Sequence, residues 1–87
     1  MNLQKGWLRC HVTEGMLPAE YAVSCNSSDG SVFSFFAPEE YINPQENLVQ
    51  VSVMECQEDT CLIYVPFDPL EGISRTIKVS TNDLIGF

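Results

Sequence analysis

The chain has 87 residues, enough for one domain, and its 45% hydrophobic content predicts a packed core rather than disorder. Twelve acidic residues face four basic ones, for a formal net charge of −8 at pH 7, which disfavours direct binding to nucleic acid and to anionic membranes. Because no apolar run is long enough to span a bilayer and the N-terminus lacks a secretory pattern, we expect a cytoplasmic protein.

Short segments in which apolar and polar residues alternate predict β-strands along the chain. In the first of these segments, Leu8, Cys10 and Val12 share one face, and Trp7 lies on the other. A short helix that opens at Pro18 is the alternative to the second strand. The predicted strands cover residues 7–13, 21–25, 31–37, 48–56, 61–67 and 73–79.

The segments between these strands contain turn residues. Residues 26–30 and 57–60 each predict a hairpin, and residues 68–72 predict a further turn. Prolines bracket residues 38–44, so this segment is expected to be a loop or a single helical turn. Residues 80–83 are expected to cap a final helical turn that carries the last apolar residues.

Six short strands joined by tight turns predict an all-β fold, namely a small six-stranded SH3-like barrel or sandwich with a short C-terminal helical turn. Residues 79–85 resemble the last strand and helical turn of SH3-like barrels, and the hairpins of residues 48–67 and 73–79 are similarly spaced. Ser80 and Asp83 replace the proline and tyrosine of the SH3 peptide groove, and Trp7 is the only tryptophan. The resemblance therefore implies the barrel and not the recognition of proline-rich peptides.

The chain has four cysteines, Cys10, Cys25, Cys56 and Cys61, and they allow three interpretations. A zinc site usually contains two closely spaced cysteine pairs, and these spacings do not match that pattern. A disulfide between Cys56 and Cys61 would cross the predicted hairpin, but cytoplasmic thiols usually stay reduced. We favour the third interpretation, small apolar residues within strands, and the sequence leaves the Cys56–Cys61 bridge undecided.

The sequence predicts no catalytic residue, metal ligand or cofactor. His11 follows Cys10, but neighbouring strand residues point to opposite faces, so we expect an exposed histidine rather than a nucleophile and its base. The acidic clusters fall in predicted turns, where carboxylates stay ionised at neutral pH. An enzyme or a metal-binding domain is accordingly the least favoured class. The acidic clusters are Glu39 with Glu40, Glu58 with Asp59, and Asp68 with Glu71.

An exposed aromatic patch bordered by acids would suit a positively charged protein partner, so we expect a non-catalytic protein-interaction module. Phe35 and Phe36 are adjacent, so one of them should point away from the core. One alternative to an exposed patch is that the second apolar face is covered, either at a barrel corner or in a homodimer. An acidic inhibitor that imitates nucleic acid is another, and solubility alone is the simplest explanation of the charge. The predicted contact residues are Trp7, Phe36, Glu39, Glu40, Tyr41, Glu58 and Asp59.

Overall fold

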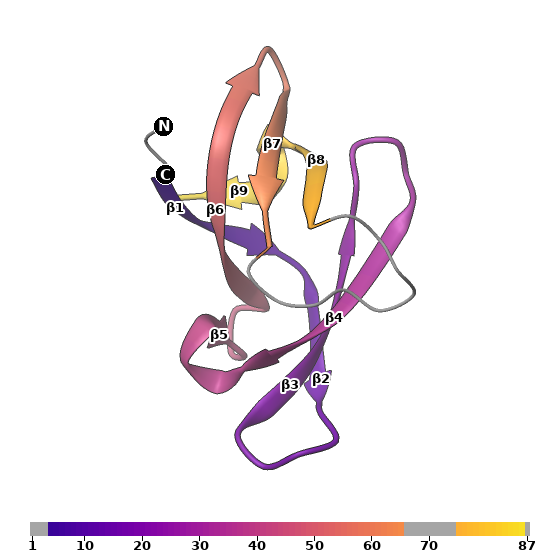
Figure 1. The fold of residues 1–87 in the computed structure, drawn as a ribbon, viewed down its shortest axis with the longest axis vertical. Coiled ribbons are helices and arrows are strands. Elements are labelled where there is room, and N and C mark those ends of the chain that lie inside the picture. The colour runs from indigo at the N-terminus through magenta and orange to yellow at the C-terminus, as the bar shows by residue number, and fades with distance from the viewer. Residues whose placement is uncertain (1–3, 66–74, 87) are drawn as a thin grey trace.

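The computed structural model describes residues 4–65 and 75–86, and it is all-β with two antiparallel sheets (Figure 1). The large sheet has the order β8-β7-β6-β1-β9, and β5 pairs with β6 outside that path. Its strands are β1 (Gln4–Arg9), β5 (Ile42–Asn43), β6 (Leu48–Gln57), β7 (Thr60–Tyr64), β8 (Thr76–Ser80) and β9 (Leu84–Ile85). The small sheet has the order β2-β3-β4, with strands β2 (His11–Glu14), β3 (Glu20–Asn26) and β4 (Val32–Pro38).

The inner faces of both sheets contribute to a single hydrophobic core. In β6, Val49, Val51 and Val53 are buried, and the residues between them are half-buried on the outward face. This is the two-residue period of a strand with one buried face. In β4, Phe35 is buried in the core and Phe36 is half-buried on the outward face, so the prediction for this aromatic pair is confirmed.

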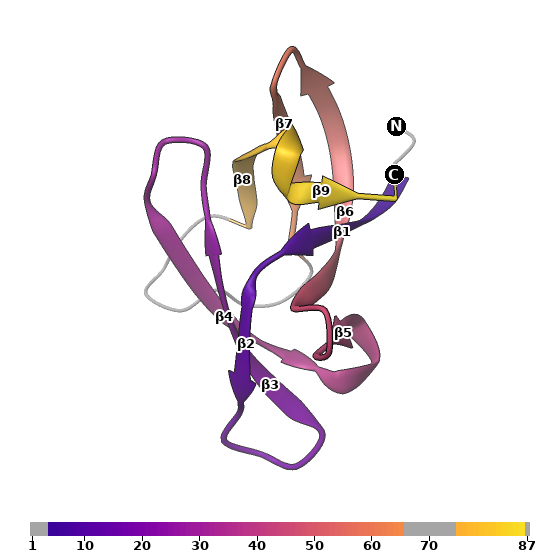
Figure 2. The same ribbon diagram turned by 180° about the vertical axis from the view of Figure 1, so that it is seen from behind.

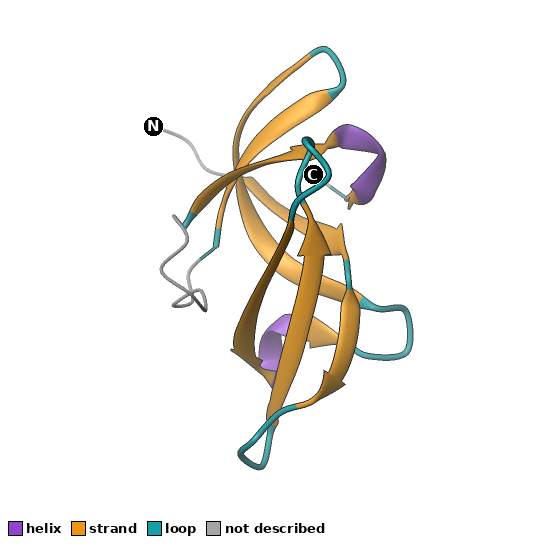
Figure 3. Cartoon of the chain, turned by 90° about the vertical axis from the view of Figure 1, so that its right-hand side faces the viewer, coloured by secondary structure: helices purple, strands orange, loops and turns teal. Residues whose placement is uncertain are grey.

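Two short 3₁₀ helices, η1 (Glu39–Tyr41) and η3 (Thr81–Asp83), follow strands (Figure 3). A C-terminal helical turn is present, but residues predicted to cap it form it: η3 is capped by the Ser80 hydroxyl, which accepts a hydrogen bond from the Asn82 amide at 3.2 Å. The last apolar residues, Leu84 and Ile85, leave that turn and form β9. Residues 38–44 contain the expected single helical turn, η1, followed by β5.

The first predicted strand is divided in the structure. Residues up to Arg9 belong to the large sheet and those from His11 onwards to the small sheet, with Cys10 between them. The alternation continues across the break, because Leu8 is buried in the core and Val12 packs against it. The prediction of a single strand over residues 7–13 is therefore wrong. The sequence pattern does not reveal the break, because both sheets turn their apolar faces toward the same core and the alternation is the same on either sheet.

The two sheets do not close into one hydrogen-bonded barrel within the described ranges. Away from the Cys10 junction, a backbone hydrogen bond joins the two sheets: the Ser28 amide, in the β3–β4 turn, donates to the Lys78 carbonyl of β8 at 2.8 Å. Seen from behind, the β3–β4 turn and β8 lie on the same side of the molecule (Figure 2). The alternative of a short helix at Pro18 is not adopted, because residues 16–19 make a turn and β3 begins at Glu20.

Four predictions extend beyond the described residues: the end of the strand at 61–67, the turn at 68–72, the acidic pair Asp68 and Glu71 in that turn, and the start of the strand at 73–79. Within the described part of the chain, no helix has both the length and the hydrophobicity needed to cross a membrane.

Candidate functional site

Four residues from neighbouring strands form a row across the outward face of the large sheet. In the pairing register, Trp7 of β1 lies opposite Gln50 of β6 on one side and opposite Ile85 of β9 on the other. The β5–β6 register, continued by one residue, places Tyr41 beside Gln50. Trp7, Gln50 and Tyr41 are half-buried, and Ile85 is 40% exposed. We call these four residues the Trp7 row.

A hollow of about 220 Å³ opens beside the Trp7 row. Tyr41 and Gln50 line it together with Lys5 and Ser52, which face each other across β1 and β6. Because neighbouring strands lie about 4.8 Å apart, four residues in a row extend over roughly 15 Å. The row is therefore long enough to contact several side chains of a partner.

Acidic residues lie at the end of the row where Tyr41 is found. Glu39 and Glu40 are exposed, form the start of η1 and directly precede Tyr41. The Glu39 amide donates a hydrogen bond to the Ala19 carbonyl at 2.9 Å. This bond attaches η1 to the turn between β2 and β3. The short helix η1 therefore lies next to both the Tyr41 end of the Trp7 row and the β2–β3 turn.

The β2–β3 turn carries two exposed apolar side chains, Met16 (83% exposed) and Leu17 (64%). They line a hollow of about 440 Å³ together with the carboxylate-bearing side chains of Glu14, Glu20 and Glu39. The Leu17 amide donates to Oε1 of Glu20 at 3.3 Å, so one of these acids also holds the turn. We call these five residues the acidic corner. The sequence does not predict the acidic corner, because a short turn has no periodicity that indicates which side chains are exposed.

The other predicted contact residues lie elsewhere. Phe36 is on the outward face of the small sheet, where it pairs with Ala22. Glu58 and Asp59 are exposed in the β6–β7 turn, at the opposite end of the long axis from the β2–β3 turn (Figures 1 and 2). That axis measures 38 Å. Of the predicted residues, Trp7 and Tyr41 both neighbour Gln50 in the register, and Glu39 and Glu40 precede Tyr41 in η1.

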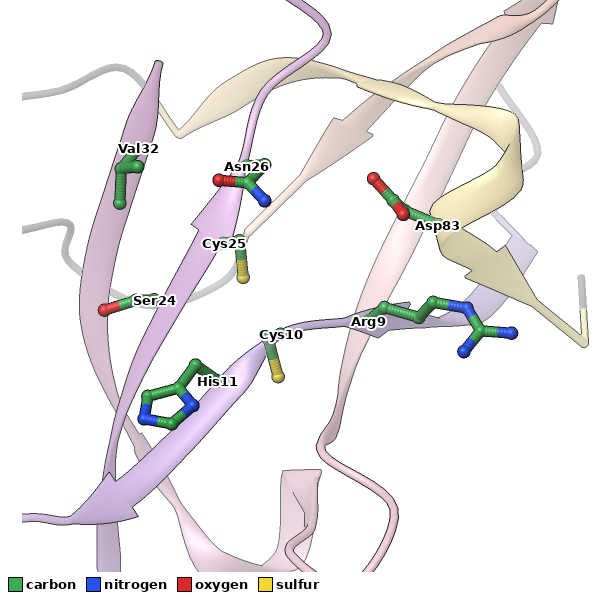
Figure 4. A pocket seen from close by; sticks show the side chains of 8 residues that line it. All are labelled: Arg9, Cys10, His11, Ser24, Cys25, Asn26, Val32 and Asp83. Atoms are coloured by element: carbon green, nitrogen blue, oxygen red, sulfur yellow. The ribbon is translucent and has the colours of Figure 1, made fainter. Parts of the chain in front are cut away.

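A further hollow, of about 380 Å³, lies where the chain passes from β1 to β2 (Figure 4). Cys10, His11 and Cys25 all line it. Cys10 packs against the core and His11 does not, so the expected alternation holds across the junction, although both residues contribute to the wall of the hollow. His11 is exposed, as predicted. The remaining lining residues are Arg9, Ser24, Asn26, Val32 and Asp83.

The Cys25 thiol in this hollow is not activated for nucleophilic catalysis. A hydrogen bond with the Cys10 thiol, followed by burial, raises the pKa of Cys25 far above its ordinary value of 9.0. Because the thiolate is the nucleophilic form, a Cys25 thiol that is buried and hydrogen-bonded to Cys10 is a poor nucleophile at neutral pH. Cys25 therefore gives no support to a cysteine–histidine catalytic pair.

Cys56 and Cys61 form a disulfide between β6 and β7, with their Cα atoms 4.0 Å apart. The favoured interpretation of four unlinked cysteines is wrong for this pair, and the structure decides the bridge that the sequence left open. The other two cysteines, Cys10 and Cys25, are free thiols. Disulfides persist mainly in oxidising compartments, so the cytoplasmic location stays a prediction.

Among residues 4–65 and 75–86, no three His, Cys, Asp or Glu side chains are grouped so that they could hold a metal ion. Comparisons with known protein families, with curated proteins and with solved structures found no match.

Proposed function

We propose that this protein is a non-catalytic interaction module that binds a protein partner with positively charged side chains next to apolar ones. The observation that carries the proposal is the position of η1. Its acids lie between the Trp7 row on the large sheet and the exposed Met16–Leu17 turn of the small sheet.

Apolar contacts would supply most of the affinity. Tryptophan and tyrosine are enriched among the residues that dominate protein interfaces. Trp7 and Tyr41 are already half-buried, so binding would order little further side-chain motion. Met16 and Leu17 are mostly exposed, and full burial of one such side chain contributes about 1.5–3 kcal/mol.

The carboxylates would guide the partner rather than hold it. An exposed ion pair contributes only about 0–1 kcal/mol. A net charge of −8 nevertheless speeds encounter with a cationic protein and fixes its orientation. We therefore expect the association rate to fall as salt increases, with a smaller effect on the dissociation rate.

The distribution of the described carboxylates supports an interaction module over a nucleic-acid mimic. A mimic would present acids in one row at the spacing of phosphates. Glu39 and Glu40 lie in η1, Glu58 and Asp59 lie in the β6–β7 turn, and Asp29 lies in the β3–β4 turn. These groups are on separate turns at both ends of the molecule.

We also propose that the two sheets form an SH3-like barrel. The Ser28–Lys78 bond brings the β3–β4 turn to the edge strand β8. That edge is the seam along which a barrel of this kind would close. The proposal implies nothing about proline-rich peptides.

A peptide of alternating lysine and leucine tests the function, with a glutamate–leucine peptide as its counterpart. We expect the lysine peptide to bind and to shift the amide NMR signals of the Trp7 row and the acidic corner. Binding should weaken as salt is raised, and the glutamate peptide should not bind. Binding of both peptides alike, or shifts confined to other faces, would refute the proposal.

Two double variants separate a specific surface from a general charge effect. Glu39→Gln with Glu40→Gln should weaken binding of the lysine peptide about tenfold, equivalent to about 1.4 kcal/mol. Glu58→Gln with Asp59→Asn removes the same two charges at the other end of the molecule and should change binding little. Equal effects of the two variants would contradict the assigned surface. A stable dimer in light scattering, abolished by Trp7→Ala, would instead assign the Trp7 row to a second copy of the chain.

A further inference from the structure

Cys10 and Cys25 lie opposite each other across neighbouring segments of the chain. The β2–β3 register pairs His11 with Ser24, and continuing it by one residue places Cys10 opposite Cys25. Both side chains line the same hollow, and Figure 4 shows them on β3 and on the β1–β2 junction. Both are free thiols.

The same chain contains a cysteine pair in an equivalent arrangement. Cys56 and Cys61 are also directly opposite in the register of two antiparallel strands, and they are joined. Facing residues in such a pair have Cα atoms about 4.5–5.5 Å apart, within the roughly 4.4–6.8 Å range of disulfides. The position of Cys10 and Cys25 therefore requires no large backbone movement for a bond to form.

We propose that Cys10 and Cys25 are a redox site, which closes into a second disulfide by exchange with a small-molecule disulfide of the glutathione type. This site is independent of the proposed binding surface. It uses different residues, and its chemistry does not require a partner protein.

The reaction proceeds through two exchange steps. The Cys10 thiol loses its proton, and its sulfur attacks one sulfur of the small disulfide, which breaks that S–S bond and releases one thiolate. Cys25 then loses its proton and attacks the sulfur of Cys10, which releases the second thiolate. The two thiolates take up the two protons. The two protein thiols lose two electrons in total, and the small disulfide gains them as two thiols.

Accessibility determines the order of the steps. Cys10 is half-buried and faces the hollow, whereas Cys25 is only 3% exposed. An incoming disulfide therefore meets Cys10 first. Cys25 stays a thiol until Cys10 is linked to the small molecule, because its pKa is raised by the Cys10 hydrogen bond and by burial.

The new bond would tie β3 to the junction between the sheets. Cys10 is already held there, because its amide and its thiol both donate to the Asn47 carbonyl, at 3.0 and 3.5 Å. The bond would also close a loop that contains β2 and the exposed Met16–Leu17 turn. We expect oxidation to reduce hydrogen exchange at the amides of β2 and β3.

The full chain, equilibrated in glutathione buffers from reducing to oxidising, tests this site. Free thiols are alkylated and the peptides are mapped by mass spectrometry. We expect a Cys10–Cys25 linked peptide to become the main form in the oxidising buffer, beside the Cys56–Cys61 peptide. The double variant Cys56→Ser with Cys61→Ser is the matched control, and it should form the Cys10–Cys25 link equally well.

Single variants test the order of the steps. Cys25→Ser should stop with one glutathione attached to Cys10, whereas Cys10→Ser should leave Cys25 unmodified. Full alkylation of both Cys10 and Cys25 in the most oxidising buffer would overturn the proposal. So would a link from Cys10 to Cys56 or Cys61. The wild-type chain alone decides between these results if a single variant does not fold.

Discussion

The amide of Cys10 donates to the carbonyl of Asn47 at 3.0 Å, at the point where the chain leaves the large sheet for the small one. The side chain of Asn47 accepts a second bond from the Val12 amide at 3.2 Å. One residue therefore holds both sides of the junction. Asn47 has a φ of 56°, in the left-handed region that asparagine adopts more readily than most residues.

Replacing Asn47 should destabilise the junction. Asn47→Ala removes a hydrogen bond that contributes about 1 kcal/mol and leaves a non-glycine residue in the left-handed region, at a further cost of about 1 kcal/mol. We expect a loss of about 2 kcal/mol in the free energy of unfolding, measured by urea denaturation. Asn47→Gly loses the same bond without the backbone strain, so its loss should be smaller. Equal losses would show that φ at this position does not matter.

The two ends of the Cys56–Cys61 disulfide should respond differently to serine. Both single variants lose a cross-link over a short loop, which contributes about 2 kcal/mol. Cys61 is 1% exposed and Cys56 is exposed, so Cys61→Ser also buries a hydroxyl in the core. We expect the free energy of unfolding of Cys61→Ser to be lower by a further 1–3 kcal/mol or so. The reverse order in chemical denaturation would contradict the burial of Cys61.

Asp29 should make stability depend on pH in the acidic range. Two hydrogen bonds lower the pKa of Asp29 from 3.8 to about 2: the larger effect comes from the Ser27 hydroxyl and the smaller one from the Ser31 amide. Because the folded-state pKa is depressed, this contribution is fully present above 3.8 and is lost as the pH falls toward about 2. Asp29→Asn should remove that part of the pH dependence. Carboxyl NMR titration gives the pKa directly, and a midpoint at or above 3.8 would refute the prediction.

Gly15 should be essential for the shape of the β2–β3 turn. Its amide donates to the Glu20 carbonyl at 3.0 Å, and a Cβ at this position would lie 2.7 Å from the same oxygen. Gly15→Ala should therefore displace the turn, shift the NMR signals of Met16 and Leu17, and weaken the binding of the lysine–leucine peptide.

Gly30→Ala is the control for this prediction. A Cβ at Gly30 would meet nothing within 4 Å, although a φ of +90° makes alanine strained there. This variant should lower stability by roughly 1 kcal/mol and leave the Met16 and Leu17 signals in place. Changes at the acidic corner in both variants would show that the corner responds to stability in general.

Local sequence patterns were sufficient to predict most strands and turns. The valines at positions 49, 51 and 53 alternate with polar or half-buried residues, and this period predicts a strand with one buried face wherever it pairs. The turn at residues 26–30 and the Ser80 cap were also predicted, because these features depend on residues that are close in sequence.

The sequence by itself determined the all-β class, the alternation of buried and exposed side chains and the acidic surface, because each depends on local pattern or on composition. Only the tertiary structure decided that the first strand divides at Cys10, that Cys10 faces Cys25, and that Trp7 and Tyr41 share Gln50 as a neighbour. These arrangements depend on which strands pair and in which register. Contacts between distant residues select that register, and a two-residue period is the same on either sheet.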